Sequence, residues 1–144
     1  MAHKRAVNRP RRLSDARHEC AHGLMAEVLG MRVKRLELNP TEDTLGLCHL
    51  DKRFVLGPLR MGIVYAAGTA IDQHYGVLEP DDWAAGDLPL IEKFFVHRSD
   101  LDQLLVLTKF YVEQYLGPIE TAAQELVKRD LTGREFRTIL RSCG

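Results

Sequence analysis

Residues 15–29 constrain the fold more than any other part of the sequence. Their apolar residues recur at spacings of three and four, which is the period of a helix that buries one side. That side would consist of Ala16, Cys20, Ala21, Leu24, Met25, Val28 and Leu29. We expect Ser14 to cap the start of this helix and Gly30 to end it. His18 and His22 stand four residues apart in it, so the helix carries both imidazoles on one face, one turn apart.

The rest of the sequence predicts a mostly helical α+β domain with a small β-sheet or hairpin after the first helix. Residues 31–38 and 44–50 indicate two short strands around a polar turn. Gly57-Pro58 opens a helix that runs to about residue 75. Apolar spacing predicts further helices after a loop at 79–86, namely over residues 90–95, 101–115 and 119–127, and a last one capped by the segment Leu131-Thr132-Gly133.

Two packing expectations follow from these elements. The small residues 66–70 let another helix approach closely, and the side of the first helix that carries Ala21 and Gly23 is the expected neighbour. The aromatic residues of the later helices are expected to lie in the core. They are Phe94, Phe95, Phe110, Tyr111 and Tyr115.

Length and charge layout indicate one domain with a basic extension. A chain of 144 residues, 45% hydrophobic and 28% charged, suits a single core. The net charge is zero, which argues against a surface built throughout to bind nucleic acid. Six cationic residues nevertheless stand among the first 17, against the single acid Asp15. We therefore predict a basic, flexible N-terminal arm over residues 1–13 and one domain over residues 14–144.

The cysteines and the apolar runs bear on location. Cys20, Cys48 and Cys143 are an odd number and form no CxxC pair, which argues against a disulfide framework. The sequence contains no apolar run of 18 residues, and no apolar signal core follows its first residues. We expect a cytoplasmic protein without membrane insertion.

The sequence His18-Glu19-Cys20-Ala21-His22 matches the pattern HExxH, the one motif with a specific chemistry. Two histidines on one helical face can bind one zinc ion, and the adjacent glutamate can act as general acid and base on a water molecule. The alternative is a degenerate site that binds metal, or nothing, and serves as a docking surface. Cys20 points away from both histidines, so we expect it to pack in the core.

A catalytic zinc needs a third protein ligand from elsewhere in the chain. The extended metzincin pattern is excluded, because Val28 stands where that pattern has its third histidine. Glu27 lies on the far side of the helix. Five downstream residues carry a suitable ligand atom: Asp72, His74, Asp87, Glu92 and His97.

The sequence from His18 to Leu24 resembles the HEAGHAL motif of the peptidase domain of FtsH-type ATP-dependent zinc proteases. The resemblance continues in order along the chain, at residues 44–46, 66–72, 86–88 and 123–140. It implies a helical zinc peptidase domain in which His18, His22 and Asp87 bind zinc. Ala21 and Thr69 depart from the family pattern, which has glycine and arginine there. The chain also contains no GxxxxGK[ST] phosphate loop, so we expect no ATP-driven unfolding.

These observations predict a zinc-dependent metalloendopeptidase that cleaves flexible or unfolded polypeptides without its own ATPase, with Glu19 as the catalytic residue. The strand at 44–50 would bind the extended substrate backbone along an edge, through Leu45, Gly46, Leu47 and Cys48. A separate partner protein would then be needed to unfold folded substrates. The alternative function is a zinc-binding interaction module that lacks activity and uses the basic arm to bind nucleic acid or an acidic partner.

Overall fold

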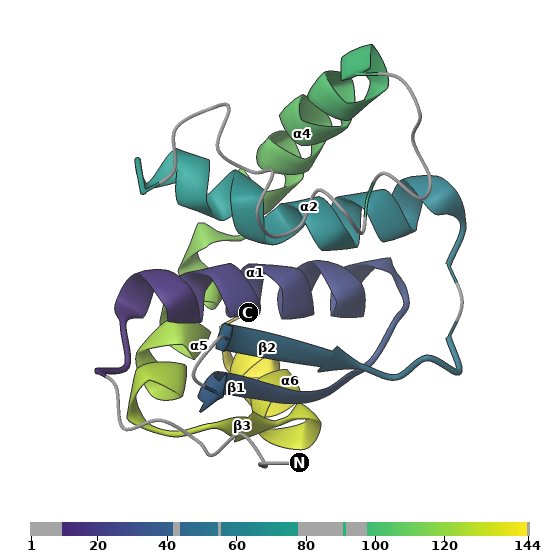
Figure 1. The fold of residues 1–144 in the computed structure, drawn as a ribbon. Coiled ribbons are helices and arrows are strands. Elements are labelled where there is room, and N and C mark those ends of the chain that lie inside the picture. The colour runs from purple at the N-terminus through teal and green to yellow at the C-terminus, as the bar shows by residue number, and fades with distance from the viewer. Residues whose placement is uncertain (1–9, 42–43, 55, 78–90, 92–97, 144) are drawn as a thin grey trace, which may run out of the picture.

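The computed structural model describes residues 10–41, 44–54, 56–77, 91 and 98–143. The prediction of a mostly helical α+β fold with a small sheet is confirmed (Figure 1). The elements are, in order, α1 (Leu13–Leu29), β1 (Val33–Thr41), β2 (Thr44–Leu50), α2 (Pro58–His74), α4 (Arg98–Glu113), α5 (Leu116–Lys128), β3 (Leu131–Thr132) and α6 (Gly133–Ser142). The expected loop at 79–86 and helix at 90–95 lie outside these ranges, except for Ile91.

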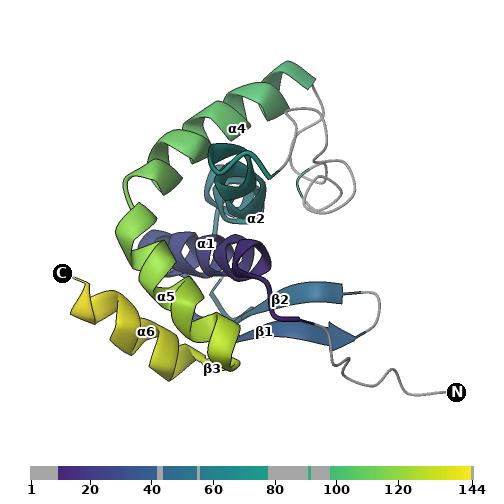
Figure 2. The ribbon, with the colours of Figure 1, turned by 90° about the vertical axis from the view of Figure 1, so that its left-hand side faces the viewer.

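Helix α1 lies at the centre of the fold. Figure 1 shows it between the sheet and α2, with α4 on the outer side of α2, and these neighbours are in contact. Figure 2 shows that α5 and α6 run along one side of these layers. Ala16, Cys20 and Met25 of α1 are fully buried, as the apolar spacing of residues 15–29 predicts. The prediction is wrong for Val28 in the last turn, which is 47% exposed. Because α1 contacts α2, α5, β1 and β2, packing on several sides fixes the positions of its side chains.

Three helix ends lie where individual residues predict them. Gly30 has a φ of 108° and ends α1 in the left-handed conformation. Pro58 opens α2. Thr132 caps α6 in a capping box, accepting a hydrogen bond from the N–H of Glu135 while the Glu135 side chain accepts one from the N–H of Thr132. The expected cap at Ser14 is wrong: α1 begins at Leu13, two residues before the expected start at Asp15, and its N-cap is Arg12. Leu13 packs against the core.

The sheet has three strands in the order β2-β1-β3, all antiparallel. The hairpin of β1 and β2 confirms the two predicted strands, although β1 extends to Thr41 and the pairing shifts register between Leu38 and Thr41. Asn39 has a φ of 52° at this irregularity. The two-residue strand β3 was not predicted, since a strand this short has no periodicity of its own. Among the described strands, β2 pairs only with β1 and is therefore an edge.

The expected contact between helices is made by a different face of α1. Gly23 faces Phe136 and Val33, on the side away from α2. In α2, the backbone at Gly68 instead lies directly against His18 and His22. The prediction that the Ala21 and Gly23 side receives α2 is therefore wrong for Gly23. The reason is that polar contacts of the two imidazoles, and not small apolar residues alone, hold α2 against α1.

Two of the aromatic residues expected in the core are exposed. Phe110 is 61% exposed and Tyr111 is 41% exposed, whereas Tyr115 packs against the core. Both exposed rings belong to α4, the outermost of the described layers, which packs against α2. Helical spacing identifies an apolar stripe but does not say whether the chain supplies a surface to cover it.

The part of the predicted N-terminal arm that the structure describes is docked on the domain. Arg11 donates hydrogen bonds to the carbonyl oxygens of Leu126 and Val127 at the end of α5, and its guanidinium lies 2.7 Å from a carboxylate oxygen of Asp130. A cation at the C-terminal end of a helix compensates the unpaired carbonyl groups there. None of the described helices is long and apolar enough to cross a membrane.

The close contact between β1 and α6 gives a test of the fold. A Cβ atom at Gly133 would overlap the carbonyl oxygen of Val33, a backbone atom that cannot move aside easily. Gly133→Ala is therefore expected to lower the free energy of unfolding by about 2 kcal/mol, measured by urea denaturation. Gly117→Ala is the matched control, because a Cβ there meets nothing within 4 Å and the helix of α5 favours alanine. Equal stability of the two variants would contradict the contact.

Candidate metal centre

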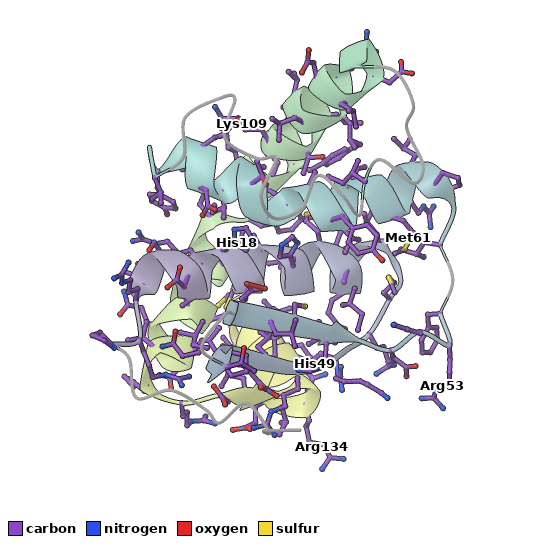
Figure 3. All side chains as sticks on the ribbon, in the orientation of Figure 1. His18, His49, Arg53, Met61, Lys109 and Arg134 are labelled. Atoms are coloured by element: carbon purple, nitrogen blue, oxygen red, sulfur yellow. The ribbon has the colours of Figure 1, made fainter. Side chains whose placement is uncertain are left out.

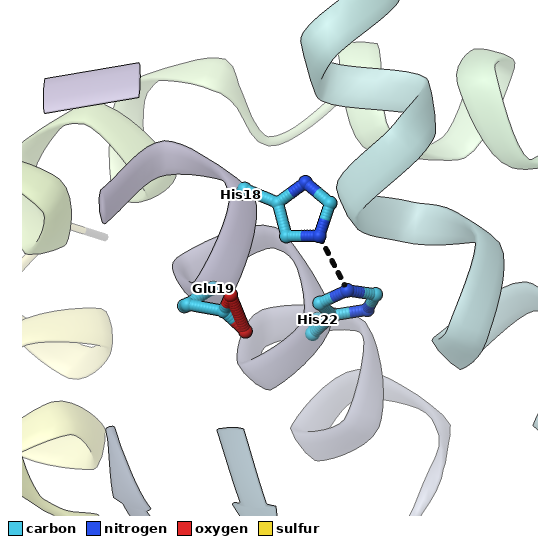
Figure 4. Close-up of side chains that lie close together, drawn as sticks. All are labelled: His18, Glu19 and His22. Atoms are coloured by element: carbon cyan, nitrogen blue, oxygen red, sulfur yellow. Dashed lines mark hydrogen bonds between the residues drawn. The ribbon is translucent and has the colours of Figure 1, made fainter. Parts of the chain in front are cut away.

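The two histidines of α1 converge on one point. His18 and His22 face α2, and their Nε2 atoms are 3.1 Å apart (Figure 4). The rings are nearly perpendicular, with an interplanar angle of 77°. Two nitrogen ligands held at about 2.05 Å from a tetrahedral zinc ion are about 3.3 Å apart. The spacing of the Nε2 atoms is therefore close to that of two ligands of one ion.

The other nitrogen of each ring is anchored to α2. Nδ1 of His22 lies 2.7 Å from the carbonyl oxygen of Val64, and Nδ1 of His18 lies 2.7 Å from Oδ2 of Asp72. A carbonyl oxygen only accepts, so Nδ1 of His22 carries the proton and donates it. In neutral His22, Nε2 then has its lone pair directed at His18. A carboxylate on His18 Nδ1 orients that ring in the same way.

This anchoring limits what can lie between the two rings. If both Nε2 atoms had unshared lone pairs at 3.1 Å, the two lone pairs would repel each other. A proton shared by the two nitrogens, or a cation bound to both, removes that repulsion. Such an arrangement, with the outer nitrogens bonded to a carboxylate and a carbonyl oxygen, is the usual surrounding of histidines that bind a metal. The donor set therefore fits a metal ion.

Glu19 belongs to the same cluster. One ligand atom from each of His18, Glu19 and His22 can be chosen so that all lie within 4.8 Å of one another. Glu19 is only 8% exposed, and its carboxylate lies against the backbone of β2 at Gly46. A Cβ at Gly46 would lie 2.8 Å from Oε2 of Glu19. The absence of a side chain at this position gives the carboxylate its place beside the histidines.

Gly68 plays the corresponding part on the other side of the cluster. A Cβ at Gly68 would lie 2.5 Å from Nε2 of His22 and would also overlap the ring of His18. Only glycine lets the backbone of α2 come this close to both imidazoles. The side chain of His18 is 24% exposed, whereas His22 as a whole residue is 8% exposed. The cluster is thus packed between α2 and β2 but open to solvent at His18.

The candidates for a third ligand divide into three groups. Asp72 lies beside His18, but it contacts Nδ1, on the opposite side of the ring from Nε2. His74 makes its contact elsewhere: its ring lies 3.3 Å from the carboxylate of Glu113 in α4. Asp87, which the resemblance to the FtsH-type family implies as the ligand, lies outside the described residues, as do Glu92 and His97. Asp72 is therefore placed to orient a ligand, and Asp87 remains a prediction.

The predicted substrate strand lies beside this cluster. Gly46 and Cys48 are on the face of β2 that is directed at α1, whereas Leu47 is on the other face and 41% exposed. Leu45 belongs to the same strand. Among the described strands β2 pairs only with β1, so its other edge has no strand partner in this part of the chain. The strand edge and Glu19 are thus neighbours through Gly46.

The two cysteines near the cluster have thiols that resist ionisation. Burial, together with the negative charge of Glu19, raises the pKa of the Cys20 thiol well above its usual value. The same two causes raise the pKa of the Cys48 thiol. Both groups therefore stay protonated at neutral pH and act as small apolar side chains. The expectation that Cys20 packs in the core is confirmed.

Comparisons with known proteins do not extend the assignment. No protein-family model matches the chain, and a search of curated proteins finds no match either. The family resemblance of the HExxH segment therefore stays a prediction, and the function has to be argued from the geometry of the site.

Three features of the centre were not foreseen from the sequence. They are the carbonyl oxygen of Val64, the contact of Asp72 with Nδ1, and the two close approaches at Gly46 and Gly68. A backbone carbonyl leaves no trace in a sequence. Gly68 and Asp72 could have been noticed in the sequence, because a spacing of four places them on the same side of a helix.

The anchoring of His22 predicts its tautomer. In metal-free protein above the titration range of histidine, His22 is expected to carry its proton on Nδ1, because Val64 accepts from that atom. Long-range ¹H–¹⁵N correlation spectra of the imidazoles measure this directly. A proton on Nε2 of neutral His22 would contradict the hydrogen bond to Val64.

Proposed function

We propose that this chain is a zinc metallopeptidase of the HExxH type, with a domain like the peptidase domain of FtsH-type proteases. The observation that carries the proposal is the pair of Nε2 atoms 3.1 Å apart, each on a ring whose other nitrogen is anchored to α2. Nitrogen donors of histidine and one carboxylate are a ligand set that zinc prefers in hydrolases. His18, His22 and Asp87 would hold the ion.

The residues around the ion divide the work of hydrolysis. When bound, zinc supplies a Lewis acid that polarises the scissile carbonyl and makes water a nucleophile at neutral pH. Glu19 would take a proton from the attacking water and pass it to the nitrogen of the leaving amine. Burial between α1 and β2 keeps its carboxylate in one position. Asp72 would hold the ring of His18 so that Nε2 stays directed at the metal.

The position of β2 supports an extended polypeptide as substrate. A peptide that pairs with the outer edge of β2 would place its backbone next to Gly46, and hence next to Glu19. Recognition through backbone hydrogen bonds depends little on the side chains of the substrate. It does require a segment that is not folded, so flexible or unfolded polypeptides are the proposed substrates. A cytoplasmic location, inferred from the cysteines, belongs to the same proposal.

The competing function is a zinc-binding module without catalysis. It shares the histidine pair but assigns Glu19 a structural part, with the basic N-terminal arm binding nucleic acid or an acidic partner. The two functions differ in what they predict for unfolded substrates and for Glu19. Protein that retains zinc and cleaves no unfolded substrate would favour the module.

Metal content tests the ligand assignment. Purified protein is expected to hold about one zinc ion per chain by elemental analysis. His22→Ala and Asp87→Ala should each lose this zinc, because each removes a proposed ligand. Asp72→Asn should retain it but bind it about 10- to 100-fold more weakly, as for other residues that orient a ligand. His74→Ala, on the same helix as Asp72, is the control and should bind zinc normally. Zinc retained by His22→Ala or Asp87→Ala would contradict that ligand.

The role of Glu19 is tested by Glu19→Gln. This variant keeps the size of the side chain but cannot accept a proton from water. It is expected to hold zinc with unchanged stoichiometry and to lose about 10²- to 10⁴-fold in kcat/KM on an unfolded reporter protein. Cleavage at the rate of the unaltered protein would rule out Glu19 as the general base.

A further inference from the structure

A polar hollow of about 400 Å³ lies at the end of the sheet where β1 begins and β2 ends. Three segments form it: the start of β1, the turn after β2, and the junction of β3 with α6. The N–H of Asp51 donates to the carbonyl oxygen of Arg32 at 2.7 Å, and Nη1 of Arg137 donates to that of Val33 at 3.0 Å. These bonds join the three segments, so the walls of the hollow are fixed by the fold.

The lining is strongly cationic. Its basic residues are Arg32, Lys34, Arg53, Arg134 and Arg137, against one carboxylate, Asp51. The chain as a whole has no net charge, so this concentration is a local property. In Figure 3, Arg134 lies at the bottom of the molecule and Arg53 at the lower right, both below the strands, whereas His18 lies above them. The hollow is therefore separate from the candidate metal centre.

Two of these cations are already held by carboxylates. The guanidinium of Arg53 donates to both oxygens of Asp51, at 2.7 to 3.1 Å, and hydrogen bonds from Arg53 lower the pKa of that carboxyl to about 2. Arg137 lies 3.2 Å from Glu27. Arg32, Lys34 and Arg134 are exposed and have no ion-pair partner among the residues that the structure describes. With Glu27 counted as a second carboxylate, an excess of three positive charges remains.

The start of α6 adds hydrogen-bond donors to the same wall. In the capping box, the N–H of Glu135 donates to the hydroxyl oxygen of Thr132. The hydroxyl proton of Thr132 is not used in this bond and can be donated to a ligand. The N–H groups of Gly133 and Arg134, in the first turn, have no acceptor within the helix. A helix start of this kind favours an anion, here in addition to the side-chain charges.

We propose that this hollow binds an oligophosphate group, that is, two or three linked phosphates. Their negative charge of about three or four matches the excess positive charge, and arginine binds phosphate through two parallel hydrogen bonds. The volume lies within the range of small-molecule sites. Among the described residues that line the hollow, none has an aromatic side chain on which a nucleobase could stack. Recognition is therefore by the phosphates, whether they are inorganic or part of a nucleotide.

Calorimetric titration of the full chain with inorganic tripolyphosphate tests the proposal. Saturable binding at a single site is expected. The double variant Arg32→Gln/Arg134→Gln should weaken it about 10- to 100-fold, because two charged donors are lost. Arg141→Gln is the matched control, since Arg141 is an exposed cation at the opposite end of α6. It should change the affinity less than about twofold, and the melting temperatures of all three proteins should agree.

The possible outcomes separate the sources of the phosphate. Equal affinity for tripolyphosphate and a nucleoside triphosphate supports recognition of the phosphates alone, and tighter binding of the nucleotide supports the site with a nucleotide as its source. The absence of saturable binding would overturn the proposal, as would equal weakening in Arg141→Gln. Single-stranded RNA that binds more tightly than tripolyphosphate and depends equally on Arg141 would overturn it in favour of an extended nucleic-acid surface. The proposal of this site does not depend on zinc content or on peptidase activity.

Discussion

The contact between α1 and α2 depends on hydrogen bonds from the two imidazoles. Nδ1 of His18 meets Asp72 and Nδ1 of His22 meets the carbonyl oxygen of Val64, and Gly68 lets the helices come close enough for both. Apolar packing would tolerate small rotations of one helix on the other. Two directed hydrogen bonds do not, because their strength falls steeply with misalignment. The convergence of the Nε2 atoms is a consequence of this rigid contact.

The sequence predicted those features of the fold that a few neighbouring residues decide. Gly30, Pro58 and Thr132 act through their own backbone preferences, and each lies where it was expected to begin or end a helix. The errors concern contacts between distant parts of the chain. The faces of Gly23 and Phe110 depend on which element packs against them, and a periodic pattern does not identify that neighbour.

The candidate site shows the same division. That His18, Glu19 and His22 form one cluster follows from helical geometry, and the structure brings them within ligand distance of one another. What surrounds the cluster was not predictable, because it comes from α2 and β2. Asp72 was one of several possible ligands in the sequence, and only the fold shows that it contacts the outer nitrogen of His18. The sequence predicts Gly46 as part of the substrate-binding strand, and the structure shows that its lack of a side chain also provides the space for Glu19.

The hydrogen bond between His22 and Val64 means that this histidine has two separate tasks. It offers Nε2 to the cluster, and it satisfies a main-chain carbonyl oxygen in a fully buried residue of α2. Removing an ion with a chelator would affect only the first task. Replacing the side chain removes a buried hydrogen bond, at a cost of about 0.5–1.5 kcal/mol, and leaves this carbonyl oxygen with only the hydrogen bond that it accepts within α2. Protein treated with a chelator and a His22 variant therefore differ in structure. The first keeps both imidazole hydrogen bonds between α1 and α2, and the second loses one of them.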